Sequence, residues 1–184
     1  MMKKTCSIVI LLLLSVFVSG YKKPHVYKVD AEKNAYFHNN VGLNYLQDHF
    51  YYAAIQEFKI AISLAPETQA SAVFYNNLGD VYMKIGHPEL AEDCYINALG
   101  LYGLNLQYYI NLAKCYKARN ILEDKMQVID IKTNPYNKIL MGMMLIESGN
   151  KRDGIIMLDE FSVTEPDLII SGGIKNFIKN LSEE

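Results

Sequence analysis

The sequence predicts an all-α protein, a helical solenoid of about four helix pairs that ends in a capping helix. Three observations lead to this fold class. Small and aromatic residues recur at a fixed spacing, prolines and glycines stand where helices are expected to begin or end, and a one-sided apolar stripe follows near the C-terminus. With 184 residues, of which 51% are hydrophobic, the chain is large enough for one continuous core.

The recurring residues are clearest in residues 35–68 and 72–105, and they return in residues 135–168. In each unit a small residue is followed by an aromatic or large apolar residue, then by a second small residue, a large residue and a final small or aromatic residue. The intervals between these five positions are the same in all three units. The successive sets are Val41-Gly42, Tyr45, Ala54, Phe58 and Ala61; Leu78-Gly79, Tyr82, Ala91, Tyr95 and Ala98; and Met141-Gly142, Leu145, Gly154, Leu158 and Phe161. The small residues predict places where the backbones of two helices approach closely, with large side chains packed around each contact.

This order of residues resembles the tetratricopeptide repeat (TPR), a helix–turn–helix unit of about 34 residues. The resemblance covers most of residues 35–168, and it implies a right-handed TPR-like solenoid over residues 31–168. In proteins of this kind the first helices of successive units line a concave groove that binds an extended peptide or a partner helix. The resemblance therefore implies a protein-interaction module.

The third unit, residues 106–134, departs from the pattern. Leu112-Ala113 and Tyr116 match the first helix of a repeat, but Lys125 stands where the second helix should have a small residue. We expect a shortened or tilted second helix near residues 121–132, with Leu122, Met126 and Ile129 facing inward.

Turn and cap signals agree with helix pairs. Gly86-His87-Pro88 predicts a turn that leads into a helix, and Asn134-Pro135 predicts a cap followed by proline in the same manner. Residues 169–184 are expected to form the capping helix. Its apolar stripe is expected to follow a helix-breaking Gly172-Gly173 pair, and it consists of Ile174, Phe177, Ile178 and Leu181.

The N-terminal segment has the pattern of an export signal. Residues 1–20 contain Lys3 and Lys4 followed by an uncharged apolar run that is short for a membrane span, so we expect a cleaved signal peptide and an extended leader over residues 21–30. The sequence therefore predicts an exported, periplasmic or extracellular protein without a stable membrane anchor. The alternative is a membrane-tethered protein with an uncleaved signal anchor.

The remaining charge does not favour nucleic acid as a partner. Of the 18 basic residues two lie in residues 1–20, which leaves 18 − 2 = 16 against 20 acidic residues and a net charge of −4. A chain without a basic field is not expected to bind nucleic acid.

An enzyme is not expected either. The four histidines, His25, His38, His49 and His87, do not have the spacing of metal ligands. No glycine-rich loop is followed by the lysine that a phosphate site needs. We therefore expect no catalytic residues, no metal and no cofactor.

The binding residues follow from the resemblance. The groove would present residues from the first helices of the first three units, namely Asn39, Asn40, Leu43, Asn76, Asn77, Asp80, Ile110, Asn111 and Lys114. Asn40, Asn77 and Asn111 recur at one place in the repeat, so a ladder of carboxamides could hydrogen-bond the backbone of an extended peptide. The alternative is that these asparagines hydrogen-bond within their own turns. The shortage of basic residues argues against the acidic C-terminal tails of cytosolic chaperones as ligands.

Cys94 and Cys115 leave two alternatives open. They lie on expected helices of neighbouring units, so in an oxidising compartment they could form a disulfide that locks the two units together. Equally, they could be two small buried core residues.

The function expected from the sequence is that of an adaptor or scaffold that holds a peptide or partner protein in its groove. One alternative is an accessory subunit of an envelope enzyme, a transporter or the outer-membrane assembly machinery. A weaker alternative is a lipid or small-molecule carrier that uses the methionines Met141, Met143, Met144 and Met157.

Overall fold

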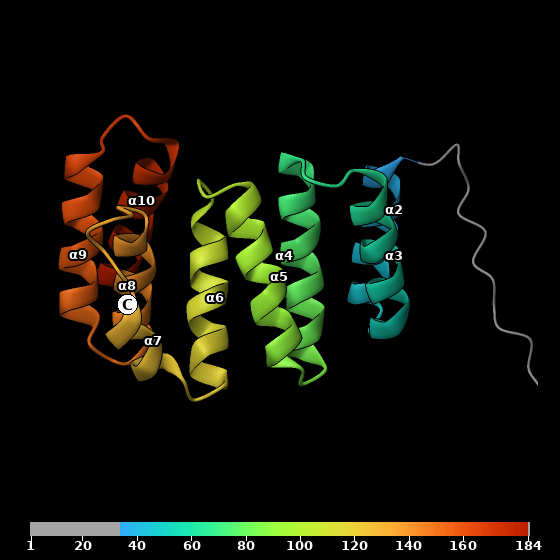
Figure 1. The fold of residues 1–184 in the computed structure, drawn as a ribbon, viewed down its shortest axis with the longest axis horizontal. Helices are drawn as coiled ribbons and strands as arrows, with labels where there is room; N and C mark the ends of the chain where they lie inside the picture. The colour runs from blue at the N-terminus through green and yellow to red at the C-terminus, as the bar shows by residue number, and fades with distance from the viewer. Residues whose placement is uncertain (1–33, 184) are drawn as a thin grey trace, which may run out of the picture. The chain divides into compact units, whose positions relative to one another are not determined.

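The computed structural model describes residues 34–183 (Figure 1). The predicted signal peptide, residues 1–20, and the predicted leader, residues 21–30, lie outside the described residues. Within the described range, none of the helices combines the length and the apolar composition that crossing a membrane requires.

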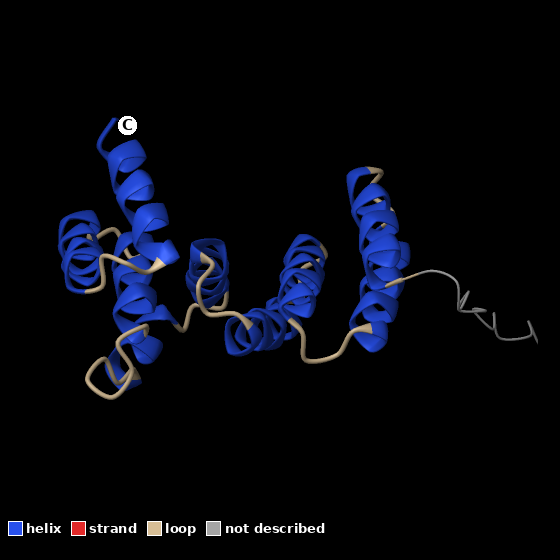
Figure 2. Ribbon diagram, turned by 90° about the horizontal axis from the view of Figure 1, so that it is seen from above, coloured by secondary structure: helices blue, strands red, loops and turns tan. Residues whose placement is uncertain are grey.

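The described residues form nine helices and no strands. Figure 2 draws the helices in blue and the segments that connect them in tan. Eight of the helices make four successive pairs, and the ninth follows the last pair. The pairs are α2 (Ala35–Gln47) with α3 (Tyr51–Leu64), α4 (Gln69–Lys84) with α5 (Pro88–Leu101), α6 (Leu106–Ala118) with α7 (Leu122–Val128), and α8 (Asn137–Glu147) with α9 (Lys151–Thr164), before α10 (Ile169–Glu183). The predicted fold class, an all-α TPR-like solenoid of about four helix pairs with a C-terminal capping helix, is confirmed.

The turn inside each pair uses one residue with positive φ. Gly86 (φ 79°) and Gly149 (φ 98°) occupy this place in the second and fourth pairs, and His49 (φ 64°) and Asn120 (φ 57°) occupy it in the first and third. Glycine adopts this left-handed conformation without steric cost, and asparagine tolerates it better than most residues. Each pair is therefore closed by the same short turn.

The first helices of the first three pairs begin at side-chain caps. The side chains of Asn34, Thr68 and Asn105 accept hydrogen bonds from backbone N–H groups in the first turns of α2, α4 and α6. Pro88 stands in the first turn of α5, as predicted. Asn134 instead accepts from the backbone N–H of Tyr136 at 3.0 Å, in the turn before α8, so α8 begins later than the sequence predicted.

The small residues of the repeat mark close contacts between the two helices of a pair. A Cβ atom added to Gly79 would lie 2.6 Å from Cε1 of Tyr95, and one added to Gly42 would lie 2.7 Å from Cε1 of Phe58. In the fourth pair a Cβ atom on Gly142 would lie 2.8 Å from Cγ of Leu158. These distances are shorter than van der Waals contact, so a larger residue cannot occupy these positions without repacking.

The third pair is irregular because its second helix is short. Helix α7 has 7 residues, whereas α3, α5 and α9 have 14 each. It ends where Ile129 becomes extended, and the Asp130 carboxylate then accepts hydrogen bonds from the backbone N–H groups of Lys132 and Thr133. Because α7 stops early, α6 packs directly against α8.

Helix α10 packs against α9, the second helix of the last pair, and also approaches α6. Ile170 and Ile174 are buried on it, and the Ser171 hydroxyl donates a 2.6 Å hydrogen bond to the Glu165 carbonyl near its start. The expectation that Gly172-Gly173 breaks the helix is wrong, because α10 continues through both residues. Both glycines are exposed, and no atom lies within 4 Å of where their Cβ atoms would be, so they remain in the helix as unpacked positions.

Candidate functional site on the first helices

Two pairs of asparagines link the first helices of the first three units. The Asn77 side-chain N–H donates to the Asn39 side-chain oxygen at 2.8 Å, which joins α4 to α2. The Asn111 side-chain N–H donates to the Asn76 oxygen at 2.9 Å, which joins α6 to α4. We call Asn39, Asn77, Asn76 and Asn111 the asparagine ladder. Its hydrogen bonds run between neighbouring units, which neither sequence alternative had anticipated.

The ladder stops at the fourth unit. In α6 the residue that corresponds to Asn39 and Asn76 is Ile110, and in α8 the residue that corresponds to Asn77 and Asn111 is Leu140. Both are half-buried and pack against the main core. Carboxamides thus join the first three units, while apolar side chains stand at the same places between the third and fourth.

Asp80 lies beside the ladder as a half-buried carboxylate. One of its oxygens accepts from the Tyr95 hydroxyl at 2.8 Å and from the Asn111 side chain at 3.0 Å. Burial raises the pKa of the Asp80 carboxyl, against the smaller lowering effects of the Tyr95 hydrogen bond and of the charges on Lys84 and Lys114. The same burial, together with the neighbouring Asp80, raises the pKa of the Tyr95 hydroxyl. These contacts hold Asp80 in one orientation.

A pocket of about 340 Å³ lies on one side of the ladder. It has an apolar part, a carboxylate and two lysines, and we call it the lysine pocket. Its lining residues come from α2, α4, α5 and α6: Leu46, Asp80, Met83, Lys84, Tyr95, Asn111 and Lys114. Among the described residues neither lysine is in an ion pair, so both ammonium groups are available to a ligand.

A second pocket of about 350 Å³ is lined near the N-terminal ends of the same first helices. Four of its nine lining residues are aromatic, three of them tyrosines, and we call it the tyrosine pocket. Its lining residues are Tyr36, Asn39, Gln69, Ala70, Val73, Phe74, Tyr102, Asn105 and Tyr108. Asn39 lines this pocket and Asn111 lines the lysine pocket, so the ladder extends from one to the other. Tyr108 is 2% exposed, and its hydroxyl forms no hydrogen bond of regular geometry among the described residues.

The structure brings part of the predicted groove together. Four of the predicted residues line the two pockets, namely Asn39, Asp80, Asn111 and Lys114. Asn76 is buried and Asn77 half-buried, and both serve the ladder; Ile110 packs against the core. Asn40 and Leu43 are exposed but line neither pocket. Whether these residues bind a ligand stays a prediction.

Sequence reasoning missed several pocket residues, including Tyr36, Leu46, Val73 and Lys84. Each stands about one helical turn from a predicted residue on the same first helix, as Lys84 does from Asp80. Extending the predicted face by one turn in each direction would have found them, because residues four apart lie on the same side of a helix.

The two cysteines are free and buried. The Cys115 thiol lies 3.1 Å from the Pro88 carbonyl oxygen, to which it donates. Burial raises the pKa of Cys94 to about 12 and that of Cys115 to about 11. The disulfide alternative is therefore not the one seen in this structure, where both residues are buried and not bonded to each other.

The described residues contain no group of three or more histidine, cysteine, aspartate or glutamate side chains that could hold a metal ion. His38 instead pairs with Glu57 at 2.7 Å, between α2 and α3.

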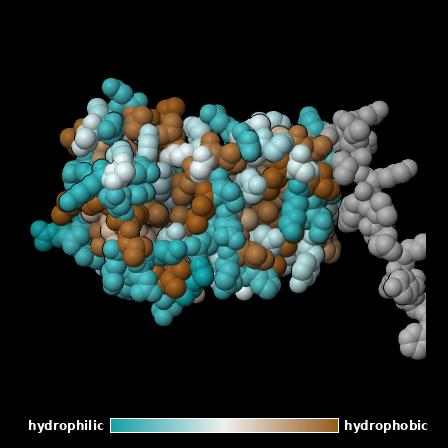
Figure 3. All heavy atoms as spheres, in the orientation of Figure 1, coloured by the Kyte–Doolittle hydropathy of each residue, from teal (hydrophilic) through white to brown (hydrophobic). Residues whose placement is uncertain are grey.

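On the face of the molecule drawn in Figure 3, hydrophobic side chains form separate patches among hydrophilic ones.

No protein-family model matches the chain, and no curated protein matches it. Several solved structures are similar to this chain. The structure described as the first TPR of Spaghetti (RPAP3) bound to the HSP90 peptide SRMEEVD is 18% identical with a TM-score of 0.49, covering 77% of this chain and 100% of that one. YrrB, described as a TPR protein with an unusual peptide-binding site, is 19% identical with a TM-score of 0.45, covering 77% and 74%. A MamA structure is 17% identical with a TM-score of 0.48, covering 72% and 74%. Residues 34–183, with the helix order described above, have a TPR-like fold.

Proposed function

We propose that the chain is a non-catalytic protein-interaction module that binds a peptide segment or a partner helix on α2, α4 and α6. One observation carries this proposal. The lysine pocket and the tyrosine pocket each draw residues from all three first helices, and the asparagine ladder connects them. A ligand that spans three units in this way would be an extended or helical segment of a protein.

The chemistry of the two pockets describes the segment that fits. The tyrosine pocket offers rings and apolar side chains, while the lysine pocket combines Leu46 and Met83 with charges of both signs. Because the Asp80 carboxylate stands among the residues that face Lys84 and Lys114, a run of acidic side chains would meet repulsion as well as attraction. The surface suits a segment with apolar and polar side chains and few charges.

We further propose that this binding takes place outside the cytoplasm, in a periplasmic or extracellular space, after removal of residues 1–20. Support comes from the sequence pattern of that segment. Intact mass spectrometry of the chain recovered from its host tests the proposal. We expect the mass of a protein that begins near Tyr21. Retention of Met1 or Met2 would contradict it.

The binding proposal is tested by site-specific photocrosslinking in the native host. A photoreactive residue at Leu43, which is 40% exposed on α2, is expected to capture a defined partner. The matched control is the same residue at Ile96, which is 46% exposed on the second helix α5. Val73 is 43% exposed on α4 and lines the tyrosine pocket, so Val73→Glu places a charge on this surface and should abolish capture at Leu43. Equal capture from Leu43 and Ile96, or capture at Leu43 that survives Val73→Glu, would overturn the proposal.

A further inference from the structure

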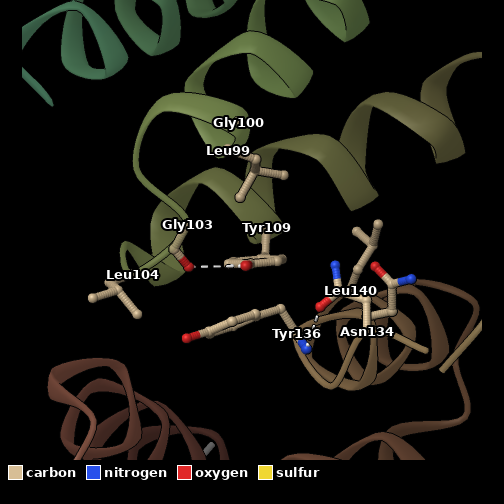
Figure 4. A pocket seen from close by; sticks show the side chains of 9 residues that line it. Leu99, Gly100, Gly103, Leu104, Tyr109, Asn134, Tyr136 and Leu140 are labelled. Carbon is tan, nitrogen blue, oxygen red and sulfur yellow. Dashed lines mark hydrogen bonds between the residues drawn. The ribbon is translucent and has the colours of Figure 1, made fainter. Parts of the chain in front are cut away.

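A pocket of about 420 Å³ lies apart from the face just described, between the end of α5 and the start of α8 (Figure 4). Its lining comes from α5, the α5–α6 turn, α6, the segment before α8, and α8 itself. The lining residues are Leu99, Gly100, Gly103, Leu104, Tyr109, Asn134, Tyr136, Asn137 and Leu140. We call it the α5–α8 pocket.

The second helix of the third pair, α7, contributes no residue to this pocket. In the first and fourth pairs, equivalent residues of the first helix contact the second helix of the same pair, as His38 contacts Glu57 and Lys138 contacts Glu160. Tyr109 occupies that place in α6, but α7 ends at Val128. The Tyr109 hydroxyl instead donates a 2.8 Å hydrogen bond to the Gly103 carbonyl. Tyr109 is 5% exposed and meets the pocket from the wall formed by α6, and no residue of α7 lines the pocket.

Two tyrosine rings form the aromatic part of the pocket. Figure 4 shows Tyr109 and Tyr136 with their rings seen nearly edge-on, one above the other. Tyr136 is supported by Phe161, whose ring centroid lies 6.0 Å from its own. Burial and, to a smaller extent, the Tyr136 hydroxyl raise the pKa of Tyr109, which agrees with their being neighbours. Tyrosine ring faces attract cations that come within about 6 Å.

The backbone at the end of α5 favours a cation as well. None of its nine lining residues is charged. Helix α5 ends at Leu101, and among the described residues the backbone carbonyls of Leu99 and Gly100 accept no hydrogen bond. The Leu99 oxygen lies 3.4 Å from where a Cβ atom on Gly103 would be, so it lies beside Gly103, one of the lining residues. Free carbonyls at a helix C-terminus carry partial negative charge.

We propose that the α5–α8 pocket binds the guanidinium group of an arginine side chain presented by a partner protein. A guanidinium is planar and stacks on aromatic faces, and its N–H groups in a rigid fork can donate to the carbonyls at the end of α5. This is a second binding site, separate from the peptide-binding face of α2, α4 and α6. Either site can therefore fail its test without deciding the other.

The probe for this site is N-acetylarginine methylamide, followed by NMR on the purified, isotope-labelled chain. Its matched control is N-acetylcitrulline methylamide, which has nearly the same shape and no charge. We expect saturable shifts of the Gly100 and Gly103 amide signals with the arginine compound and none with the citrulline compound. Tyr136→Leu should weaken binding roughly two- to thirtyfold, whereas Tyr136→Phe, which keeps a ring, should retain it.

A second variant supplies the cation from the chain itself. Gly100 lies in α5 with no atom within 4 Å of where its Cβ would be, so a side chain fits there. Gly100→Arg should occupy the pocket and abolish the shifts caused by the arginine compound, while the uncharged Gly100→Gln should leave most of the affinity. Equal binding of the citrulline compound, absence of saturable shifts, or unchanged binding in Gly100→Arg would each overturn the proposal.

Discussion

The side-chain amide of Asn77 on α4 donates a 2.8 Å hydrogen bond to the side-chain oxygen of Asn39 on α2, across 38 residues of sequence. Asn39 is 6% exposed, so its carboxamide has little access to water. This bond makes Asn77 a contact between two repeats as well as a candidate ligand-binding residue.

Asn77→Ala is therefore expected to destabilise the fold, by about 1–3 kcal/mol, because it leaves the buried Asn39 oxygen without its donor. Chemical denaturation followed by circular dichroism measures the change. The matched control is Asn40→Ala, since Asn40 is exposed and lines neither pocket on the first helices; its effect should stay within about 0.5 kcal/mol. Equal stability of the two variants would show that the ladder does not join the repeats.

Gly79→Ala should destabilise the second helix pair by about 1–3 kcal/mol, since the added methyl group would lie 2.6 Å from Cε1 of Tyr95. Thermal melting detects the loss. Gly100→Ala provides the comparison, because Gly100 is also helical but has open space at its Cβ position. That substitution should be neutral or stabilise by about 0.5–1 kcal/mol. A lowered melting temperature in Gly100→Ala alone would contradict the packing described for Gly79.

Glu92→Gln should loosen the short helix α7. The Glu92 carboxylate is buried on α5 and forms ion pairs with Arg119 after α6 and, at 2.8 Å, with Lys125 on α7. Because the two cations are partly exposed, we expect a loss of about 1–3 kcal/mol, less than for a fully buried pair. Amide hydrogen exchange should become faster in residues 122–128. Glu123→Gln, an exposed change on α7 itself, should leave the exchange unaltered, and protection that persists in Glu92→Gln would contradict the prediction.

The two cysteines should be unreactive in the folded chain. Burial raises the pKa of Cys115 to about 11, so its thiol remains protonated at neutral pH, and the same holds for Cys94 with a pKa of about 12. In the chain without residues 1–20, which contain Cys6, titration with a thiol reagent at neutral pH should detect neither thiol until the chain is denatured without reductant, and then both. A denatured, unreduced protein without free thiols would show a disulfide.

The raised thiol pKa values also predict how stability depends on pH. The folded state favours the protonated thiols relative to the unfolded state, where the ordinary pKa is 9.0. The stabilisation is therefore complete below about pH 9 and decreases as the pH rises towards 11 and 12. Denaturation midpoints measured across this range should fall less in Cys115→Ala than in the unchanged chain. A parallel fall in both would assign the pH dependence to other groups.

Much of the fold could be read from the sequence because its signals are local. The spacing of Gly42 and Ala54, or of Gly79 and Ala91, reflects how two helices joined by a tight turn touch each other, and both partners lie within one repeat. The early end of α7 was also expected, since Lys125 replaces a small residue and removes a close contact. Gly172-Gly173 misled the prediction, because an intrinsic helix breaker is tolerated where the rest of the helix is anchored by buried residues such as Ile170 and Ile174.

The sequence by itself determined the helix pairs, their order and the face on which Asn76 and Asn77 lie, because helical periodicity and turn chemistry act over a few residues. Only the tertiary structure decided that Asn77 bonds Asn39, that Asn111 bonds Asn76 and that α8 packs on α6 beside an open pocket. Those partners are supplied by neighbouring repeats far along the chain. Their distances depend on how whole helices stack, and no local pattern encodes that stacking.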